Sequence, residues 1–134
     1  MMLATGPAPV SRGRILLIED EPSVAAFLRI ALERRGYQVI PSSSAVEGLL
    51  LLATGDFRGV ISDFRTPGGI TGADVHDWLE RHRPELASRM IFITGDTASD
   101  ETIALLGQAG PPCVEKPFRV HQLMAAVEKT IGKP

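Results

Sequence analysis

The sequence predicts an α/β fold in which a doubly wound, five-stranded parallel sheet carries helices on both faces. Short aliphatic segments alternate five times with longer amphipathic segments, and this alternation is typical of a parallel sheet. The first, third and fourth aliphatic segments are continuous apolar runs, as expected of strands buried on both faces. A chain of 134 residues that is 44% hydrophobic is sufficient for one domain with one core.

The first strand and the first helix are predicted at 14–20 and 22–36. The strand segment "RILLIED" is aliphatic and ends in acidic residues. Pro22 is tolerated in the first turn of a helix, and Gly36 favours its end. The predicted apolar face of this helix consists of Val24, Phe27, Leu28, Ala31 and Leu32.

The next two strands and helices continue the pattern. Strands are predicted at 37–40 ("YQVI") and 58–63 ("RGVISD"). Helices are predicted at 43–55, which has a serine cap and a glycine stop, and at 72–84, which a proline closes. Gly48 lies inside the first of these helices, where glycine lowers the helix propensity.

The last two units are predicted as strands at 89–96 and 111–116 and helices at 99–110 and 119–132. Right-handed crossovers between so many short strands favour the flavodoxin-like strand order 2-1-3-4-5. The predicted inward face of the last helix consists of Val120, Leu123, Met124, Val127 and Ile131.

The segment before the first strand has a different composition. Residues 1–13, "MMLATGPAPVSRG", are rich in Gly, Pro and Ala, which predicts a flexible leader or linker before a domain at 14–134. The formal net charge of −2 argues against a general nucleic-acid or membrane-surface binder. The single cysteine cannot form an internal disulfide, so we expect a cytoplasmic setting.

Polar residues follow four of the five predicted strands. Glu19 and Asp20 follow the first strand, Asp63 the third, Thr94 the fourth and Lys116 the fifth. In open parallel sheets the carboxyl ends of the strands form the ligand site, so we expect these side chains to meet. Clustered carboxylates repel one another unless a cation offsets the repulsion, and oxygen ligands of this kind suit Mg²⁺. With the ammonium and hydroxyl groups beside it, Asp63 is the predicted nucleophile of a phosphoryl transfer.

Four segments in this order resemble the receiver domain of the two-component response-regulator family: "ILLIEDEP", "VISDFRTPGG", "FITGD" and "VEKPF". The resemblance covers about 14–132. It implies that Glu19, Asp20 and Asp63 bind Mg²⁺ together with the backbone carbonyl of Arg65. It also implies that Asp63 is the phosphorylated residue and that Pro67 is the proline four residues after it.

The resemblance extends to the residues that receive the phosphoryl oxygens and to the partners. Thr94 and Lys116 match the family's hydroxyl residue and lysine, and the Lys116–Pro117 bond is expected to be cis. The implied phosphodonor is a histidine kinase or a histidine phosphotransfer protein. The chain is expected to act as a phosphoacceptor and not as an enzyme in its own right, without direct contact to nucleic acid or membrane. A stand-alone receiver, the receiver of a hybrid histidine kinase and a weak homodimer all stay open.

Cys113 lies where the resembled family usually has Tyr or Phe, three residues before the lysine. In the family this ring swings inward on phosphorylation. Cys113 is expected to pack beneath the last helix as a small apolar residue. We therefore expect phosphorylation to reshape this surface less than in relatives that carry the ring, with coupling through 64–71 instead.

The residues also allow other interpretations. A receiver-like interaction module that is never phosphorylated stays open. An aspartate-nucleophile phosphatase would need a second aspartate two residues after the first, where this chain has Pro22, and a flavin site would need a glycine-rich loop in place of "EDEP". Asp96 and Asp100 are read as helix caps, and Trp78 as partly buried. The histidines, read as surface residues without metal-ligand spacing, are His76, His82 and His121.

Overall fold

The sheet has five parallel strands in the order β2-β1-β3-β4-β5, as predicted. It is seen in a computed structural model that describes residues 13–65, 68–95 and 110–134. The ends of the strands differ from the predicted ends by at most two residues, and Glu19 and Asp20, which the predicted segment 14–20 included, lie outside the first strand. The strands are β1 (Arg14–Ile18), β2 (Gln38–Ser42), β3 (Gly59–Asp63), β4 (Met90–Thr94) and β5 (Cys113–Glu115).

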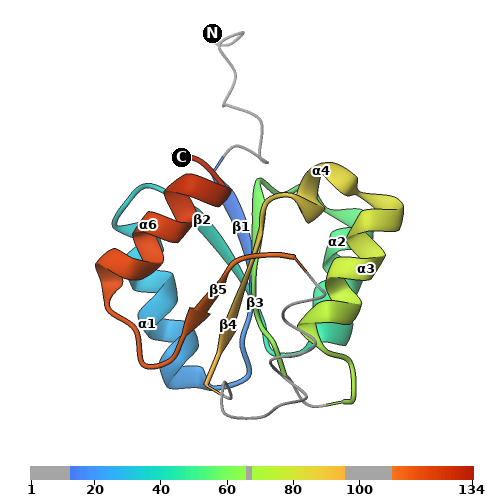
Figure 1. The fold of residues 1–134 in the computed structure, drawn as a ribbon, viewed down its shortest axis with the longest axis horizontal. Coiled ribbons are helices and arrows are strands. Elements are labelled where there is room, and N and C mark those ends of the chain that lie inside the picture. Colours follow the sequence, from blue (N-terminus) through green and yellow to red (C-terminus); the bar gives the residue numbers. More distant parts are fainter. Residues whose placement is uncertain (1–12, 66–67, 96–109) are drawn as a thin grey trace, which may run out of the picture.

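Helices cover both faces of this sheet. Helices α1 (Pro22–Glu33) and α6 (Val120–Thr130) lie on one face, and α2 (Ala45–Thr54) and α3 (Gly72–His82) lie on the other (Figure 1). The helix predicted at 99–110 falls almost entirely outside the described residues. In the part of the chain that the structure describes, no helix is long and apolar enough to cross a bilayer.

One short helix was not predicted. Pro84 does not simply close the third helix; a four-residue helix, α4 (Pro84–Ala87), begins there. Proline lacks an N–H, and the first turn of a helix leaves N–H groups unbonded, so proline is tolerated at this position. The sequence pattern therefore predicted the end of α3 correctly but did not predict the short helix α4 that follows it.

The core forms two layers, one on each side of the sheet. The layer under α1 and α6 contains Ile15, Leu17, Ile61, Ile91 and Ile93 of the strands. Two residues expected in this layer are exposed: Phe27 is 45% and Val120 37% accessible. Phe27 lies at the margin of the apolar face of α1, and Val120 is the first residue of α6, where the end of the helix leaves it accessible. The other layer, under α2 and α3, includes Leu16, Ile18, Val60, Phe64 and Phe92.

The glycine inside α2 has a packing reason. A Cβ atom at Gly48 would lie 2.6 Å from Cδ1 of Ile18, a residue of the inner strand β1. Only a residue without a side chain lets the helix approach the sheet this closely, so packing overrides the unfavourable propensity. Helix α2 still has a capped N-terminus, because the Ser44 hydroxyl accepts a hydrogen bond from the Glu47 amide.

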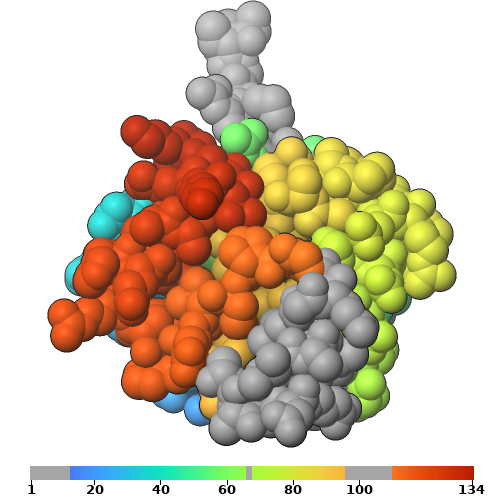
Figure 2. Space-filling view, viewed as in Figure 1, coloured from blue at the N-terminus to red at the C-terminus, as the bar shows by residue number. Residues whose placement is uncertain are grey.

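The sheet has two dissimilar edges. Strand β2 forms one edge. It ends at Ser42, two residues beyond the predicted segment "YQVI", and therefore includes Pro41. Strand β5 forms the other edge and has only three residues, of which Val114 alone is buried. Figure 2 shows β5 and α6 next to each other on the surface.

Candidate functional site

The side chains predicted to meet do lie at one end of the sheet. Asp63 is the last residue of β3 and pairs with Ile93 of β4, so Thr94 follows immediately beside it. The Lys116 amide donates to the Thr94 carbonyl over 2.7 Å, which brings the residue after β5 to the same end. In Figure 1 this end of the strands is at the bottom, opposite the N and C labels.

Three carboxylates form the floor of the site. Glu19, Asp20 and Asp63 each place one oxygen within 4.8 Å of the others. The Glu19 side chain is fully buried and Asp63 is 12% accessible, while Asp20 is exposed. Carboxylate oxygens at this spacing, with one open side, suit a hard divalent cation that keeps some of its water. The donor set therefore fits Mg²⁺.

A single ammonium group is bonded to two of these carboxylates. Lys116 Nζ lies 3.0 Å from Glu19 Oε1 and 3.4 Å from Asp63 Oδ2. The other Glu19 oxygen accepts the Glu21 amide over 3.0 Å, so Glu19 is held on both sides. The Lys116–Pro117 bond is cis, as expected. Lys116 is thus a built-in counterion that leaves part of the negative charge uncompensated.

The pKa values of Asp63 and Lys116 are both shifted, by burial and by the negative charge of the carboxylate cluster. Burial and, to a smaller extent, the Glu19 carboxylate raise the pKa of Asp63, Lys116 opposes both, and the resulting pKa is about 7. Burial lowers the pKa of the Lys116 ammonium, but its bonds to Glu19 and Asp63 raise it more, and the net pKa lies above the usual value. One more positive charge beside Asp63 would favour its carboxylate form, which is what a bound dication supplies.

Two further predicted residues frame the site. Thr94 is 2% accessible at the end of β4. Arg65 is exposed, and its backbone forms an antiparallel bridge with Thr71. Whether its carbonyl serves as a metal ligand stays a prediction. Pro67, Asp96 and Asp100 lie outside the described residues.

An apolar groove next to the site was not predicted. It has a volume of about 430 Å³ and is lined by Val24, Phe27 and Phe118 beside Lys116. The rings of Phe27 and Phe118 lie 6.3 Å apart between centroids. The helical pattern grouped Phe27 with the buried residues, and no feature of the sequence distinguished it from Leu28.

Two interpretations of single residues were wrong. Cys113 does not pack beneath α6: it is exposed, because β5 turns Val114 inward and its neighbours outward. Burial of part of the thiol and the Glu115 carboxylate raise the pKa of Cys113. His76 was expected on the surface but is 7% accessible, with its ring against Phe92. Trp78 is partly buried, as predicted.

Comparison with known proteins gives a consistent result. The family model described as the response regulator receiver domain matches residues 15–128. The chain is 32% identical over 119 residues to the transcriptional regulatory protein KdpE of Mycobacterium tuberculosis, covering 89% of this chain and 51% of the relative. It is 29% identical over 123 residues to the uncharacterized transcriptional regulatory protein YkoG of Bacillus subtilis, covering 91% and 52%. The chain spans about half the length of these relatives.

Solved structures share the fold. The receiver domain of a signal transduction histidine kinase from Syntrophus aciditrophicus has a TM-score of 0.80 at 26% identity, covering 89% of each chain. The response regulator protein TrrA of Thermotoga maritima, solved in complex with Mg²⁺ and BeF, has a TM-score of 0.75 at 26% identity, covering 87% of this chain and 97% of that one.

Proposed function

The chain belongs to the response regulator receiver family, and from this premise we propose that Asp63 accepts a phosphoryl group from a phosphohistidine in a Mg²⁺-dependent step. The observation that carries the proposal is the cluster of Glu19, Asp20 and Asp63 with Lys116 bonded to two of its members. The expected phosphodonor is a histidine kinase or a histidine phosphotransfer protein.

The reaction needs Asp63 as a free carboxylate. One of its oxygens forms a bond to phosphorus while the P–N bond of the phosphohistidine breaks, and the leaving imidazole nitrogen takes a proton from water. Lys116 lies 3.4 Å from Asp63 Oδ2, so its ammonium is placed to neutralise charge on the transferred group. Thr94 ends the neighbouring strand, where its hydroxyl is proposed to bond a phosphoryl oxygen.

The metal would be held by Glu19, Asp20 and Asp63, with the Arg65 carbonyl as the further ligand that the resemblance implies. When bound, Mg²⁺ supplies positive charge that neutralises the phosphoryl oxygens in the transition state. Lys116 already pairs with Glu19 and Asp63 over 3.0 and 3.4 Å. Lys116 would therefore act as a fixed positive charge next to Asp63, and Mg²⁺ would act as an exchangeable one.

The setting of the reaction is part of the proposal. Residues 14–134 are proposed to be the receiver domain, and 1–13 a leader or linker. A phosphohistidine partner and free Mg²⁺ are expected together in the cytoplasm, so the protein is proposed to act there. The apolar groove of Phe27 and Phe118 opens beside Lys116.

The test uses a small phosphodonor, phosphoramidate, and intact-mass detection of the phosphorylated chain. We expect one phosphoryl group per chain with Mg²⁺, none with EDTA, and none on Asp63→Asn in either buffer. Asp56→Asn is the matched control, because Asp56 is an exposed aspartate paired with Arg83 at the other end of the sheet. Labelling of Asp63→Asn would refute the assignment, and a parent chain that never labels would favour the unphosphorylated interaction module.

A further inference from the structure

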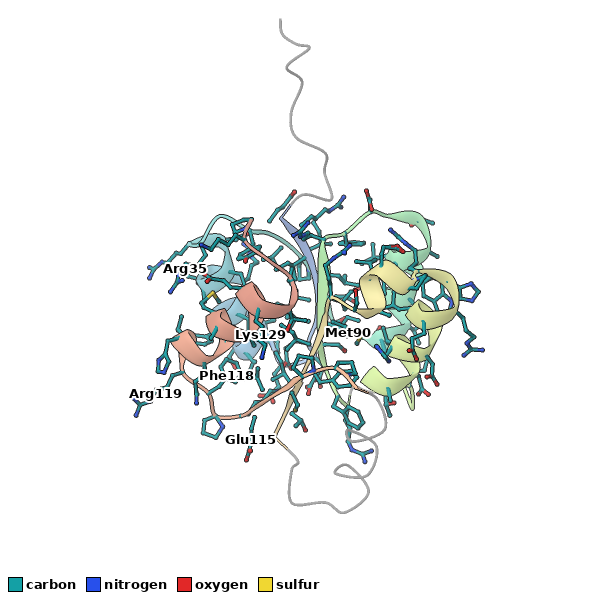
Figure 3. The ribbon with its side chains drawn as sticks, turned by 45° about the horizontal axis from the view of Figure 1, so that its top comes forward. Arg35, Met90, Glu115, Phe118, Arg119 and Lys129 are labelled. Atoms are coloured by element: carbon teal, nitrogen blue, oxygen red, sulfur yellow. The ribbon has the colours of Figure 1, made fainter. Side chains whose placement is uncertain are left out.

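A cavity beside α3 contains a buried histidine that the proposed function does not use. The cavity has a volume of about 400 Å³, and its lining includes His76 and Glu80 of α3, Met90 of β4, and Gly110 before β5. Met90, labelled in Figure 3, is the first residue of its strand. None of the lining residues belongs to the carboxylate cluster around Asp63. The cavity is therefore separate from the phosphorylation site.

The ring of His76 is buried but lacks a hydrogen bond. The residue is 7% accessible, and its ring contacts Phe92 edge to face, with 6.4 Å between the centroids. Within the described ranges, neither ring nitrogen of His76 takes part in a hydrogen bond. Both nitrogens retain some accessible surface, because the only unbonded side-chain nitrogen or oxygen there that is fully buried belongs to Arg14. Buried imidazole rings normally bond through their nitrogens, so the partner of His76 has to enter from the cavity.

Glu80 supplies a second donor atom on the same face of α3. Its Oε1 lies 3.7 Å from Nδ1 of His76, one helical turn away, which is too long for a hydrogen bond. Zn²⁺ bonds imidazole nitrogen and carboxylate oxygen at about 2.1 Å each. One ion can therefore reach both atoms across this gap, with an angle of about 125° between its two bonds, somewhat wider than tetrahedral.

Two ordinary explanations compete with a metal ion. A protonated His76 would be attracted to Glu80 in the same arrangement, and water in the cavity would bond a neutral ring. Neither explanation uses the size of the cavity, which at about 400 Å³ exceeds the space of one water molecule many times. A bound ion with its own water ligands uses this space. The spacing of the three histidines excludes a site made of histidines alone, but not one that pairs His76 with a carboxylate.

We propose that His76 and Glu80 form a binding site for a divalent transition metal ion of the Zn²⁺ class. The ion is bound by Nδ1 of His76 and by a carboxylate oxygen of Glu80, and water in the cavity completes its shell. Imidazole suits Zn²⁺, Cu²⁺ and Ni²⁺, whereas Mg²⁺ takes oxygen ligands. The chain therefore has two cation sites that select different ions, one at the carboxylate cluster and one beside α3.

The binding test is a Zn²⁺ titration of ¹⁵N-labelled protein, with Mg²⁺ in excess so that the carboxylate cluster is occupied. Two-bond ¹H–¹⁵N spectra report the ring nitrogens. We expect the Nδ1 signal of His76 to shift and to saturate at one equivalent, while the ring signals of His82 and His121 stay in place. His76→Gln should abolish this binding. Glu80→Gln should weaken it at least about tenfold, because loss of even an outer-shell partner of a metal ligand has an effect of that size.

The controls separate this site from general attraction of Zn²⁺. His121→Gln and Glu85→Gln remove an exposed imidazole and an exposed carboxylate elsewhere and should bind as the parent does. Cys113→Ser should also bind as the parent does, although Cys113 is an exposed thiol that could take Zn²⁺.

Two results would overturn the proposal. One is a parent chain whose His76 ring signals do not move with Zn²⁺, which would leave water as the partner of the ring. The other is a Glu80→Gln chain that binds Zn²⁺ as tightly as the parent. Glu80 is exposed, so this variant serves even if His76→Gln does not fold. Phosphoramidate should label Glu80→Gln at the parent rate, so failure of Zn²⁺ binding leaves the proposed function untouched.

Discussion

The two ends of the sheet hold charge in opposite ways. At the carboxyl end, Glu19 and Asp63 are buried next to each other, and the single ammonium of Lys116 pairs with both. At the amino end, Arg58 and Arg89 are tied to backbone carbonyls. The first arrangement raises the pKa of Asp63 to about 7, mainly through burial. The second adds hydrogen bonds that hold strand starts and the end of α6 together.

The charged groups at the carboxyl end are placed for a reaction, whereas those at the amino end stabilise the fold. Like charges in a buried cluster lower the stability of the fold, and such strain persists at sites where function needs it. Guanidinium groups bonded to carbonyls stabilise the fold through their donors. Substitutions at the carboxyl end should therefore remove phosphorylation without loss of stability. Substitutions at the amino end should lower stability and leave phosphorylation unchanged.

The largest expected effect is on phosphorylation. Lys116→Met should slow labelling of Asp63 by phosphoramidate about a hundredfold, as removal of one preorganised charge-stabilising donor does elsewhere. Mg²⁺ affinity should not fall, because the remaining carboxylates lose a competing cation. Rates come from intact-mass time courses, with the exposed Lys129→Met as the control. A Lys116→Met chain that labels at the parent rate would remove Lys116 from the site.

The next effect is on stability and depends on pH. In Mg²⁺-free buffer the folded pKa of Asp63, about 7, lies above its usual value of 3.8. Between these values the folded state binds more protons than the unfolded state, so the free energy of unfolding of the parent falls as pH rises. Asn does not titrate. Asp63→Asn should thus gain on the order of 2 kcal/mol over the parent above pH 7, and this gain should vanish toward pH 4.

Urea unfolding across this pH range measures the gain, and Asp56→Asn supplies the baseline. A gain that is equal at pH 4 and pH 8 would mean that Asp63 carries no raised pKa. Saturating Mg²⁺ should reverse the order of the two proteins at pH 8, because only the parent retains the full ligand set.

At the amino end a smaller change in stability is expected without any change in labelling. The Tyr37 hydroxyl donates to the Gly132 carbonyl, next to the bond between Arg58 and Ile131. Tyr37→Phe should lower the free energy of unfolding by about 1 kcal/mol, the usual value of one such hydrogen bond. Phosphoramidate labelling should proceed at the parent rate. If Tyr37→Phe also slows the labelling of Asp63, the two ends of the sheet are coupled, and their separate roles in stability and phosphorylation are refuted.

The smallest effect concerns the surface around β5. The sequence places Cys113 where the family usually has an aromatic ring, so we expect little rearrangement there on phosphorylation. Amide shifts with a beryllofluoride mimic of the acyl phosphate should be larger at 64–71 than at 109–121. In a Cys113→Tyr variant, the amide shifts at 109–121 should become larger. Shifts at 109–121 that already exceed those at 64–71 in the parent would show that the ring is dispensable.

Most of the fold and the acidic site could be predicted because both depend on repeating features of the chain. Alternating strand and helix segments define a parallel sheet, and the carboxyl ends of its strands then gather Glu19, Asp63 and Lys116. What the sequence did not reveal depends on contacts between distant elements. The exposure of Phe27 and the burial of His76 are examples, since each lies where its own helix permits either outcome.

Three arginines at the starts of neighbouring strands show the same limit. Arg14, Arg58 and Arg89 are far apart in the sequence, and each stands at the start of a strand, where a polar residue is ordinary. Only the strand order makes them neighbours.

The two edges of the sheet bear on how the protein behaves at high concentration. An exposed strand edge can recruit a strand from another molecule and begin aggregation. Pro41 in β2 offers no N–H to such a strand, and β5 is three residues long with the charged, exposed Glu115 at its end. Neither edge is a good template for intermolecular β-pairing. The chain should therefore tolerate crowding without forming fibrils, even though three of its five strands are strongly aliphatic.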